Sequence, residues 1–267
     1  MACAGPSAPA STPGSVALGA RPELPSDLEA QVHQAEQLGR AIFEQDLASS
    51  RASDALLESL GGEPDPRIRG FISRREGSRW RVQYFGGEPT EPAEQRLSLL
   101  WEAGVGAFGG GVSLDRVDPP RPLDAEGERM ARARTTATAQ RFQACSSRYD
   151  AIVLPASMIG QSGFLVYLLA SNAARGEWMV GGHQRFLISE DGTSVLGHQS
   201  LSRSCLSVPA SRRPEGSSSG AWVTHVVSDA PAETHVFLSL LHQSPLFVGT
   251  RRGVWRVAGE KISFEGS

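Results

Sequence analysis

The chain has 267 residues, of which 40% are hydrophobic and 21% charged, and its formal net charge is −3 at pH 7. A chain of this length can bury a substantial core without a structural metal or dense disulfides. The slightly acidic balance gives no electrostatic reason to expect nucleic acid as a partner. Lys261 is the only lysine and Asn172 the only asparagine, a bias that is typical of a GC-rich genome and favours a bacterial source.

The first 22 residues are rich in Pro, Ala, Ser, Thr and Gly and poor in large apolar side chains. Such a segment cannot bury enough apolar surface to order itself, so we expect residues 1–22 to form a disordered tether and residues 23–267 a single domain. Ala2-Cys3-Ala4-Gly5 resembles the start of a processed bacterial lipoprotein, in which a lipidated cysteine precedes a flexible tether. The resemblance implies lipidation of Cys3 and attachment to the membrane of the cell envelope, provided that a signal peptide is encoded ahead of it.

Three cysteines are an odd number, which in an exported protein calls for an explanation. Acylation of Cys3 would leave Cys145 and Cys205, and we expect these two to form a disulfide bond. The alternative is a cytosolic protein that starts at Met1 and keeps its other cysteines as buried thiols.

The first structured element predicted is a long helix. Ser26 and Glu29 form a capping-box pattern, and apolar residues recur at helical spacing from Leu28 to Leu60. A Gly-Gly pair and two prolines directly after Leu60 end the pattern. We expect one long helix, or two abutting ones, with a single apolar stripe that packs on the rest of the domain.

After this helix the hydrophobic period becomes alternating, which predicts a hairpin of strands around 67–72 and 79–84. Trp80, Val82 and Tyr84 share the inward face, so the arginines of this hairpin are expected in solvent rather than on a nucleic-acid surface. A second strand pair is predicted over 97–103 and 111–117, ended by two prolines. A second helix is expected near 124–143, with Asp124 as its N-cap.

Only strands are predicted from there to the C-terminus. Residues 151–174 carry no charge, but proline, glycines and serines interrupt them, so two buried strands joined by a turn are favoured over a transmembrane helix. The predicted fold class is α+β: a mainly antiparallel sheet, flat or strongly curved, with the long N-terminal helix and the helix near 124–143 packed on it. The further strands are expected at 178–189, 195–202, 221–227, 235–241, 246–250 and 254–257.

Two glycine-rich segments match parts of known motifs without the structural context that these motifs need. Residues 104–109 read Gly-Val-Gly-Ala-Phe-Gly, as in a dinucleotide site, but more glycines and two prolines follow where a helix would have to begin. Residues 160–163 read Gly-Gln-Ser-Gly and fall short of a nucleophile elbow, which needs glycine in place of Phe164. We therefore predict a glycine-rich hairpin at the first segment and no cofactor.

His225 and His235 are the two metal-ligating side chains that the predicted strands bring together. If a hairpin centres on Ala230, the two histidines face one another at a distance that would allow them to share a metal ion. Glu233 would be the third ligand, although on the turn. The preferred interpretation is a pair of strand histidines without a metal, and His183, His198 and His242 show no ligand spacing.

The sequence shows no converging set of acid, base and nucleophile, so no catalytic residue, cofactor or metal is predicted. We expect an exported bacterial protein, anchored by a lipid to the envelope, that has a binding or structural role without catalytic activity. Its partner would be an unknown protein or envelope component, and not nucleic acid. One alternative is a hydrolase whose site is assembled from distant residues, with His225, His235 or His183 as the base. The other is a cytosolic domain of unknown role.

Overall fold

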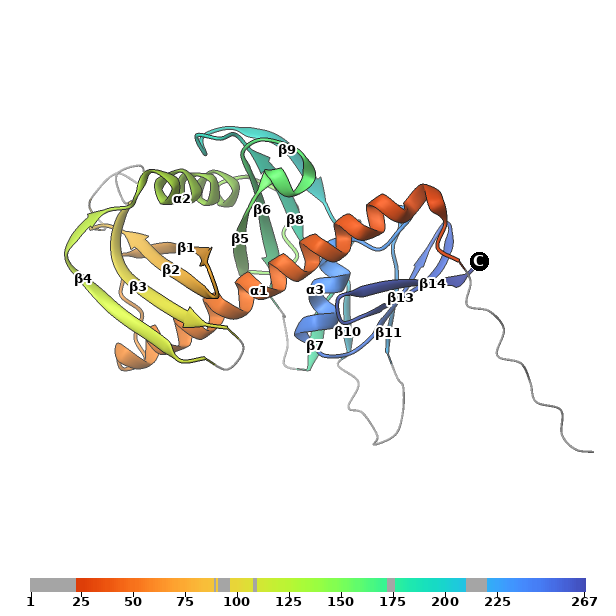
Figure 1. The fold of residues 1–267 in the computed structure, drawn as a ribbon, viewed down its shortest axis with the longest axis horizontal. Helices are drawn as coiled ribbons and strands as arrows, with labels where there is room; N and C mark the ends of the chain where they lie inside the picture. Colours follow the sequence, from red (N-terminus) through yellow and green to blue (C-terminus); the bar gives the residue numbers. More distant parts are fainter. Residues whose placement is uncertain (1–22, 89, 91–96, 108–109, 172–175, 210–219) are drawn as a thin grey trace, which may run out of the picture.

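The computed structural model describes residues 23–88, 90, 97–107, 110–171, 176–209 and 220–267 (Figure 1). The expected tether and Cys3 lie outside these residues. Helices combine with mainly antiparallel four-stranded sheets, which confirms the predicted α+β fold class.

The N-terminal helix is a single continuous element. A short turn, η1 (Ser26–Leu28), leads into α1 (Glu29–Ser59). The expected capping box does not form, because Ser26 belongs to this turn and no side chain caps either η1 or α1. The helix ends before Gly61, whose φ of +71° is left-handed and therefore favours glycine.

The first sheet is an antiparallel meander in which each strand pairs with the next. The two predicted strand pairs are confirmed, but the last strand continues through Pro119-Pro120 to Pro122. The prolines are tolerated because this strand lies at the edge of the sheet, and its register shifts between Leu99 and Trp101 of its neighbour. The strands are β1 (Ile68–Glu76), β2 (Arg79–Gly86), β3 (Ser98–Gly106) and β4 (Val112–Pro122).

The second helix, α2 (Ala125–Thr138), is followed by a second antiparallel sheet. Asp124 caps α2 as predicted, by accepting a hydrogen bond from the backbone N–H of Gly127, but the helix ends five residues earlier than expected. The uncharged segment forms two paired strands, as predicted, and no helix among the described residues is long and apolar enough to cross a membrane. The sheet has the order β5 (Tyr149–Pro155), β6 (Phe164–Ala170), β8 (Gln184–Ile188) and β9 (Val195–Ser200), with η3 (Ala156–Ile159) between β5 and β6.

The strand expected over 178–189 is broken in two. β7 (Glu177–Met179) leaves the second sheet and pairs with β10 (Ser207–Pro209), and the chain turns back at Gly182, whose φ is +86°. A disulfide joins Cys145 and Cys205 beside this turn. A Cβ atom at Gly182 would lie 2.4 Å from the Cβ of Cys145, so only glycine lets the turn pass the disulfide.

The third sheet contains β11 (Ala221–Thr224), β12 (Leu246–Thr250), β13 (Gly253–Ala258) and β14 (Lys261–Gly266). β11 and β12 are parallel, and α3 (Glu233–Leu241) connects them. The strand predicted over 235–241 is therefore wrong. The first seven residues of α3 are all buried, so the run shows neither the helical nor the alternating period by which the two structures are told apart. β14 was not predicted.

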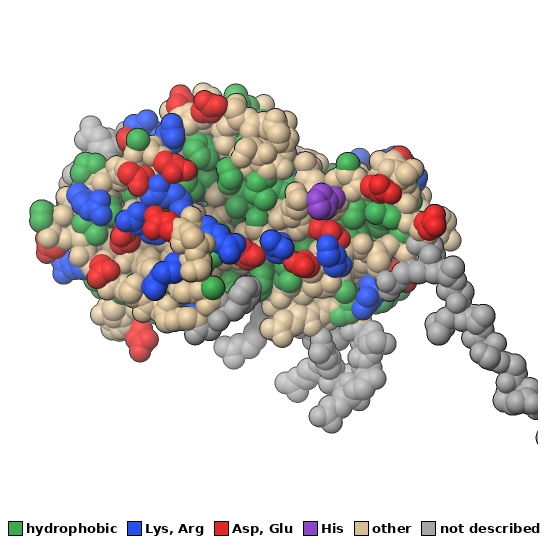
Figure 2. Space-filling view, in the orientation of Figure 1, with side chains coloured by type: hydrophobic (Ala, Val, Ile, Leu, Met, Phe, Trp, Pro, Cys, Tyr) green, Lys and Arg blue, Asp and Glu red, His purple; other side chains and the backbone are tan. Residues whose placement is uncertain are grey.

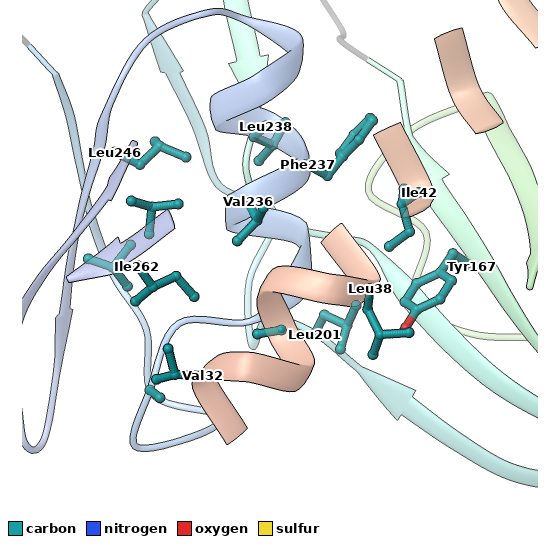
Figure 3. Close-up of a cluster of buried hydrophobic side chains, with 14 of the residues drawn as sticks. Val32, Leu38, Ile42, Tyr167, Leu201, Val236, Phe237, Leu238, Leu246 and Ile262 are labelled. Atoms are coloured by element: carbon teal, nitrogen blue, oxygen red, sulfur yellow. The ribbon is translucent and has the colours of Figure 1, made fainter. Parts of the chain in front are cut away.

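α1 packs on two different parts of the domain. In its N-terminal half, Val32, Leu38 and Ile42 meet Val236 of α3 and Ile262 of β14 in one buried cluster (Figure 3). Its C-terminal half belongs to another cluster, formed by Ala48, Ala52 and Leu56 of α1 with Val82, Tyr84, Ala103 and Val105 of the first sheet. The predicted apolar stripe is thus confirmed, and it joins the two ends of the molecule (Figure 1).

The first and second sheets lie edge to edge between α1 and α2. Successive residues of β1 and β5 alternate between the two helices: Ile72 and Val153 belong to the cluster with α2, whereas Phe71 and Leu154 belong to clusters with α1. β1 and β5 are the edge strands of their sheets, and they face each other. This arrangement positions the site described below.

Gly39 tests the close packing of α1 on α3. A Cβ atom at this position would lie 2.5 Å from the Cβ of Val236 and 2.6 Å from the carbonyl oxygen of Glu233. Alanine ordinarily stabilises a helix by about 1 kcal/mol relative to glycine, but here the methyl group must push α3 away, so for Gly39→Ala we expect a net loss of about 1–2 kcal/mol in the free energy of unfolding. Urea denaturation followed by circular dichroism measures it. Ser50→Ala, at an exposed position of α1, is the control and should not destabilise the protein; a gain in stability for Gly39→Ala would contradict the packing.

Candidate functional site

A groove of about 750 Å³ lies between the facing edges of the first and second sheets. Hydrophobic side chains gather in this hollow, and charged side chains follow the course of α1 beside it (Figure 2). A volume of this size is within the range of ligand-binding clefts. The lining residues are His33, Glu36, Gln37, Arg40, Ala41, Glu44 and Gln45 of α1, Ser73, Arg74, Arg75 and Glu76 of β1, Trp80 of β2, Glu126 and Met130 of α2, Val153, Leu154 and Pro155 of β5, Met158 of η3, Phe164 of β6, and Glu260 and Lys261 near the start of β14.

The apolar part of the groove comes mainly from the second sheet. β5 supplies Val153 and Leu154, which are 3% and 5% exposed, and Met158 of η3 and Phe164 of β6 are partly buried beside them. α2 adds Met130. Contact with these side chains would remove apolar surface of a ligand from water, which is the main favourable contribution to binding in such clefts.

The charged side chains at the rim neutralise one another. Lys261 lies 3.0 Å from Glu36, Arg75 lies 3.0 Å from Glu44, and Arg40 lies 3.4 Å from the same Glu44. Arg74 is held by Asp124, and the hydrogen bond from its guanidinium lowers the pKa of that carboxyl. Because each of these cations already has a carboxylate partner, the groove offers little attraction to a ligand of either charge.

Gln45 is the buried polar side chain that stands out on the groove wall. It is 2% exposed, and its amide nitrogen donates a 2.8 Å hydrogen bond to the backbone carbonyl of Ser73. This acceptor fixes the orientation of the amide, since the reverse orientation would place two oxygens together. The Oε1 atom of Gln45 then has no hydrogen-bond partner among the described residues. A buried acceptor without a partner is costly, so the wall of the groove carries an unsatisfied polar atom just below its surface.

A second, much smaller pocket of about 90 Å³ contains His225, Ser228 and Glu233. Glu233 is the first residue of α3 and accepts hydrogen bonds from the hydroxyl of Tyr167 at 2.9 Å and from Arg185 at 2.7 Å. The carboxylate therefore forms a buried ion pair with Arg185 that joins α3 to the second sheet. It does not act as the third metal ligand considered from the sequence.

His225 and His235 are close together, but not as predicted. His235 lies on α3 instead of a strand, and the two rings meet edge to face with their centroids 4.9 Å apart. One nitrogen of His225 bonds to the hydroxyl of Ser228 at 2.7 Å, and Nδ1 of His235 accepts the backbone N–H of Ala232. Among the described residues, no group of three or more histidine, cysteine or acidic side chains could hold a metal ion.

The three histidines considered as a catalytic base are held in structural roles. His183 binds the backbone through both ring nitrogens, to Ala170 and Met179. The hydroxyl of Ser228 also lies 2.7 Å from the carbonyl oxygen of Ala230, to which it donates. His225 must then donate its own N–H to Ser228, which is the opposite of what a base that activates a serine does.

The first glycine-rich segment lies at a hairpin, as predicted, and the second lies in a turn between η3 and β6. Gly104 and Gly106 end β3 in a hairpin with β4, and no helix follows them; part of this segment lies outside the described residues. Ser162 is exposed in the turn between η3 and β6. Neither segment has the strand-to-helix geometry that its motif requires.

The arginines of the first hairpin were expected in solvent, but several of them are only partly exposed and form ion pairs with acidic side chains. The side chain of Arg74 is 15% exposed, and Arg81 bonds to Glu76 and Glu102. Val82 and Tyr84 face inward as predicted, and Trp80 lies at the groove. The groove itself was not predicted, since its lining comes from eight separate elements.

Comparison with models of known protein families, with curated proteins and with solved structures finds no significant match to this chain.

The buried histidines predict a loss of stability in mild acid. Burial lowers the pKa of His235 to about 3 and that of His183 to about 4, from a usual value of 6.5. Between these values and pH 6.5 the unfolded chain binds protons that the folded protein does not. Each histidine therefore lowers the free energy of unfolding by about 1.4 kcal/mol for every pH unit by which the solution is made more acidic. Asp46 opposes this effect below pH 6, because burial raises its pKa to about 6 and the folded protein then takes up its proton first.

Urea denaturation at pH 7 and pH 5 measures this effect. The loss of stability between the two values should be about 2 kcal/mol smaller in His235→Gln than in the wild-type protein. His33→Gln, at an exposed position of α1, serves as the control and should leave the loss unchanged. An equal loss in His235→Gln and the wild type would contradict the assignment of a neutral, buried His235.

Proposed function

We propose that this chain is an exported bacterial binding protein, held at the cell envelope by a lipid on Cys3, that binds a partner in its groove without transforming it. The observation that carries the proposal is the groove of about 750 Å³, which combines apolar walls with a rim whose cations already have carboxylate partners. A site of this kind suits recognition by shape and apolar contact. His183, His225 and His235, the histidines considered as a catalytic base, are engaged in structural hydrogen bonds.

The cysteines support the proposed location. The Cys145–Cys205 bond closes a loop of 60 residues, and such bonds persist in oxidising compartments such as the bacterial periplasm. It also leaves Cys3 as the single cysteine of the chain outside the disulfide. A lipidated Cys3 would tether the domain to the membrane through residues 1–22.

The intact mass of protein purified from its native host tests the location. We expect a mass increase that corresponds to a lipid on Cys3, and a further gain of two hydrogens on reduction when the Cys145–Cys205 bond opens. Cys3→Ser should abolish the lipid adduct and release the protein from the membrane fraction, while it leaves the disulfide intact. An unmodified chain with three free thiols would contradict export and anchoring together.

The neutral dye N-phenyl-1-naphthylamine tests the groove, because its fluorescence rises in apolar surroundings. We expect the wild-type protein to bind the dye, and Met158→Glu to weaken binding about tenfold by placing a charge among the apolar side chains of the groove. Leu57→Glu is the matched control, since Leu57 is 42% exposed on α1 and does not line the groove. Equal dye binding by Met158→Glu and Leu57→Glu would contradict a binding site in the groove.

A further inference from the structure

We infer that the occupant of the groove is an extended segment of a partner polypeptide, which adds as a strand to the free edge of β1. This inference rests on the proposed binding function of the groove and goes further by naming the class of partner and the atoms that recognise it.

The edge of β1 that points away from β2 lies at the groove. β1 and β2 are joined by the two-residue turn Gly77-Ser78, so the closing pair Glu76 and Arg79 exchanges hydrogen bonds. In an antiparallel ladder every second residue bonds to the neighbouring strand, and the residues between them point their backbone N–H and C=O groups the other way. Counted from Glu76, the residues that point away from β2 are Arg75 and Ser73. The hydrogen bond from Gln45 to the carbonyl of Ser73 agrees with this direction. Both residues line the groove.

Gln45 extends this edge. Its amide nitrogen occupies the carbonyl of Ser73, the acceptor that an added strand would otherwise use, and its own Oε1 has no partner among the described residues. Oε1 is itself buried, so a peptide N–H reaches it only when the Gln45 side chain shifts toward the groove. The side-chain amide has the same donor and acceptor chemistry as a backbone amide, so it suits a polypeptide better than an apolar molecule without hydrogen-bond donors.

The opposite wall has the same character. β5 is the edge strand of the second sheet, and its residues Val153, Leu154 and Pro155 line the groove across from β1. The two edges approach each other where Arg134 lies over the ring of Phe71 and bonds to the carbonyl of Ala151. Beyond this point the groove separates them. A strand in the groove would lie between the two sheets, with one helix on each side of it.

The surroundings determine what side chains this strand should carry. Side chains of a strand alternate between two faces, here toward α2 with Met130 and toward α1 with Ala41 and Gln45. The rim charges are paired with one another, so charged side chains gain little. We therefore expect a segment with apolar residues at alternate positions. Main-chain hydrogen bonds to an edge strand and pockets for alternate side chains are how strand addition binds peptides in general.

A phage-displayed library of random dodecapeptides provides the probe. Peptides are selected on the folded wild-type protein and counter-selected on Met158→Glu. We expect enriched sequences with alternating apolar residues, and synthetic versions of them should protect the backbone N–H of Arg75 from hydrogen exchange. Two N-methylated versions of a selected peptide are then compared, one methylated at its odd-numbered residues and the other at its even-numbered residues. Only one of the two should lose binding, because only alternate N–H groups of the peptide face β1.

Arg75→Pro isolates the backbone contact. Proline removes the outward N–H of Arg75 and leaves the ladder with β2 intact, since that N–H takes no part in it. Arg75→Ala is the matched control, because both variants lose the ion pair with Glu44. We expect the selected peptides to bind Arg75→Pro about tenfold more weakly than Arg75→Ala. Thermal unfolding of both variants checks that the difference does not come from loss of the fold.

Each other outcome has a distinct meaning. Equal binding of the peptides by Arg75→Pro and Arg75→Ala would overturn strand addition at β1. Dye binding without any selected peptide would overturn the inference and leave the proposed binding function standing, whereas failure of both would remove the groove as a site. Tight binding of a synthetic peptide of residues 1–22 would overturn the assignment to a partner, since the occupant would then be this chain itself.

Discussion

The close contact between α1 and α3 at Gly39 sets the arrangement of the whole domain. Because Gly39 has no side chain, α1 can lie against the backbone of α3 and bring Val32, Leu38 and Ile42 into the core beside the third sheet. The same straight helix then carries Ala52 and Leu56 onto the first sheet. One helix thus fixes the positions of sheets that are far apart in the sequence, and the side of it that stays uncovered between them becomes a wall of the groove.

The sequence predicted the elements whose pattern is local. The long helix has an apolar stripe at helical spacing, and the hairpin of β1 and β2 has alternating residues on either side of Gly77, so both were placed to within a few residues. Asp124 was identified as an N-cap because an acidic side chain in that position satisfies exposed N–H groups of a helix. The disulfide followed from counting cysteines.

The errors arose where the tertiary structure overrides the local pattern. α3 is buried on nearly all sides, so its sequence has no polar face that would mark it as a helix. The parallel pairing of β11 and β12 requires a crossover between them, which explains why a helix lies there, but this pairing is not visible in the sequence. β4 runs through two prolines because none of the described strands pairs with its outer edge. His225 and His235 were expected together for the wrong reason, since a helix and not a hairpin brings their rings into contact.

The groove could not be predicted from the sequence at all. Gln45 looks like any polar residue on a helix, and its importance depends on the carbonyl of Ser73 and on the edge position of β1. The apolar residues of β5 look like ordinary core. The site arises from the way in which the two sheets are held apart, and no single segment contains a signal for it.

The position of α1 also has a consequence for how the protein is made. Its first turns are held by residues near the other end of the chain: Arg252 pairs with Asp27, and Lys261 pairs with Glu36, each pair being 225 residues apart in sequence. The N-terminal half of this helix therefore finds its apolar partners in α3 and the third sheet only near the end of synthesis, whereas its C-terminal half packs on the first sheet, which follows it directly in the sequence. Contacts of such long sequence separation slow folding, and until they form the N-terminal half of the apolar stripe of α1 is exposed.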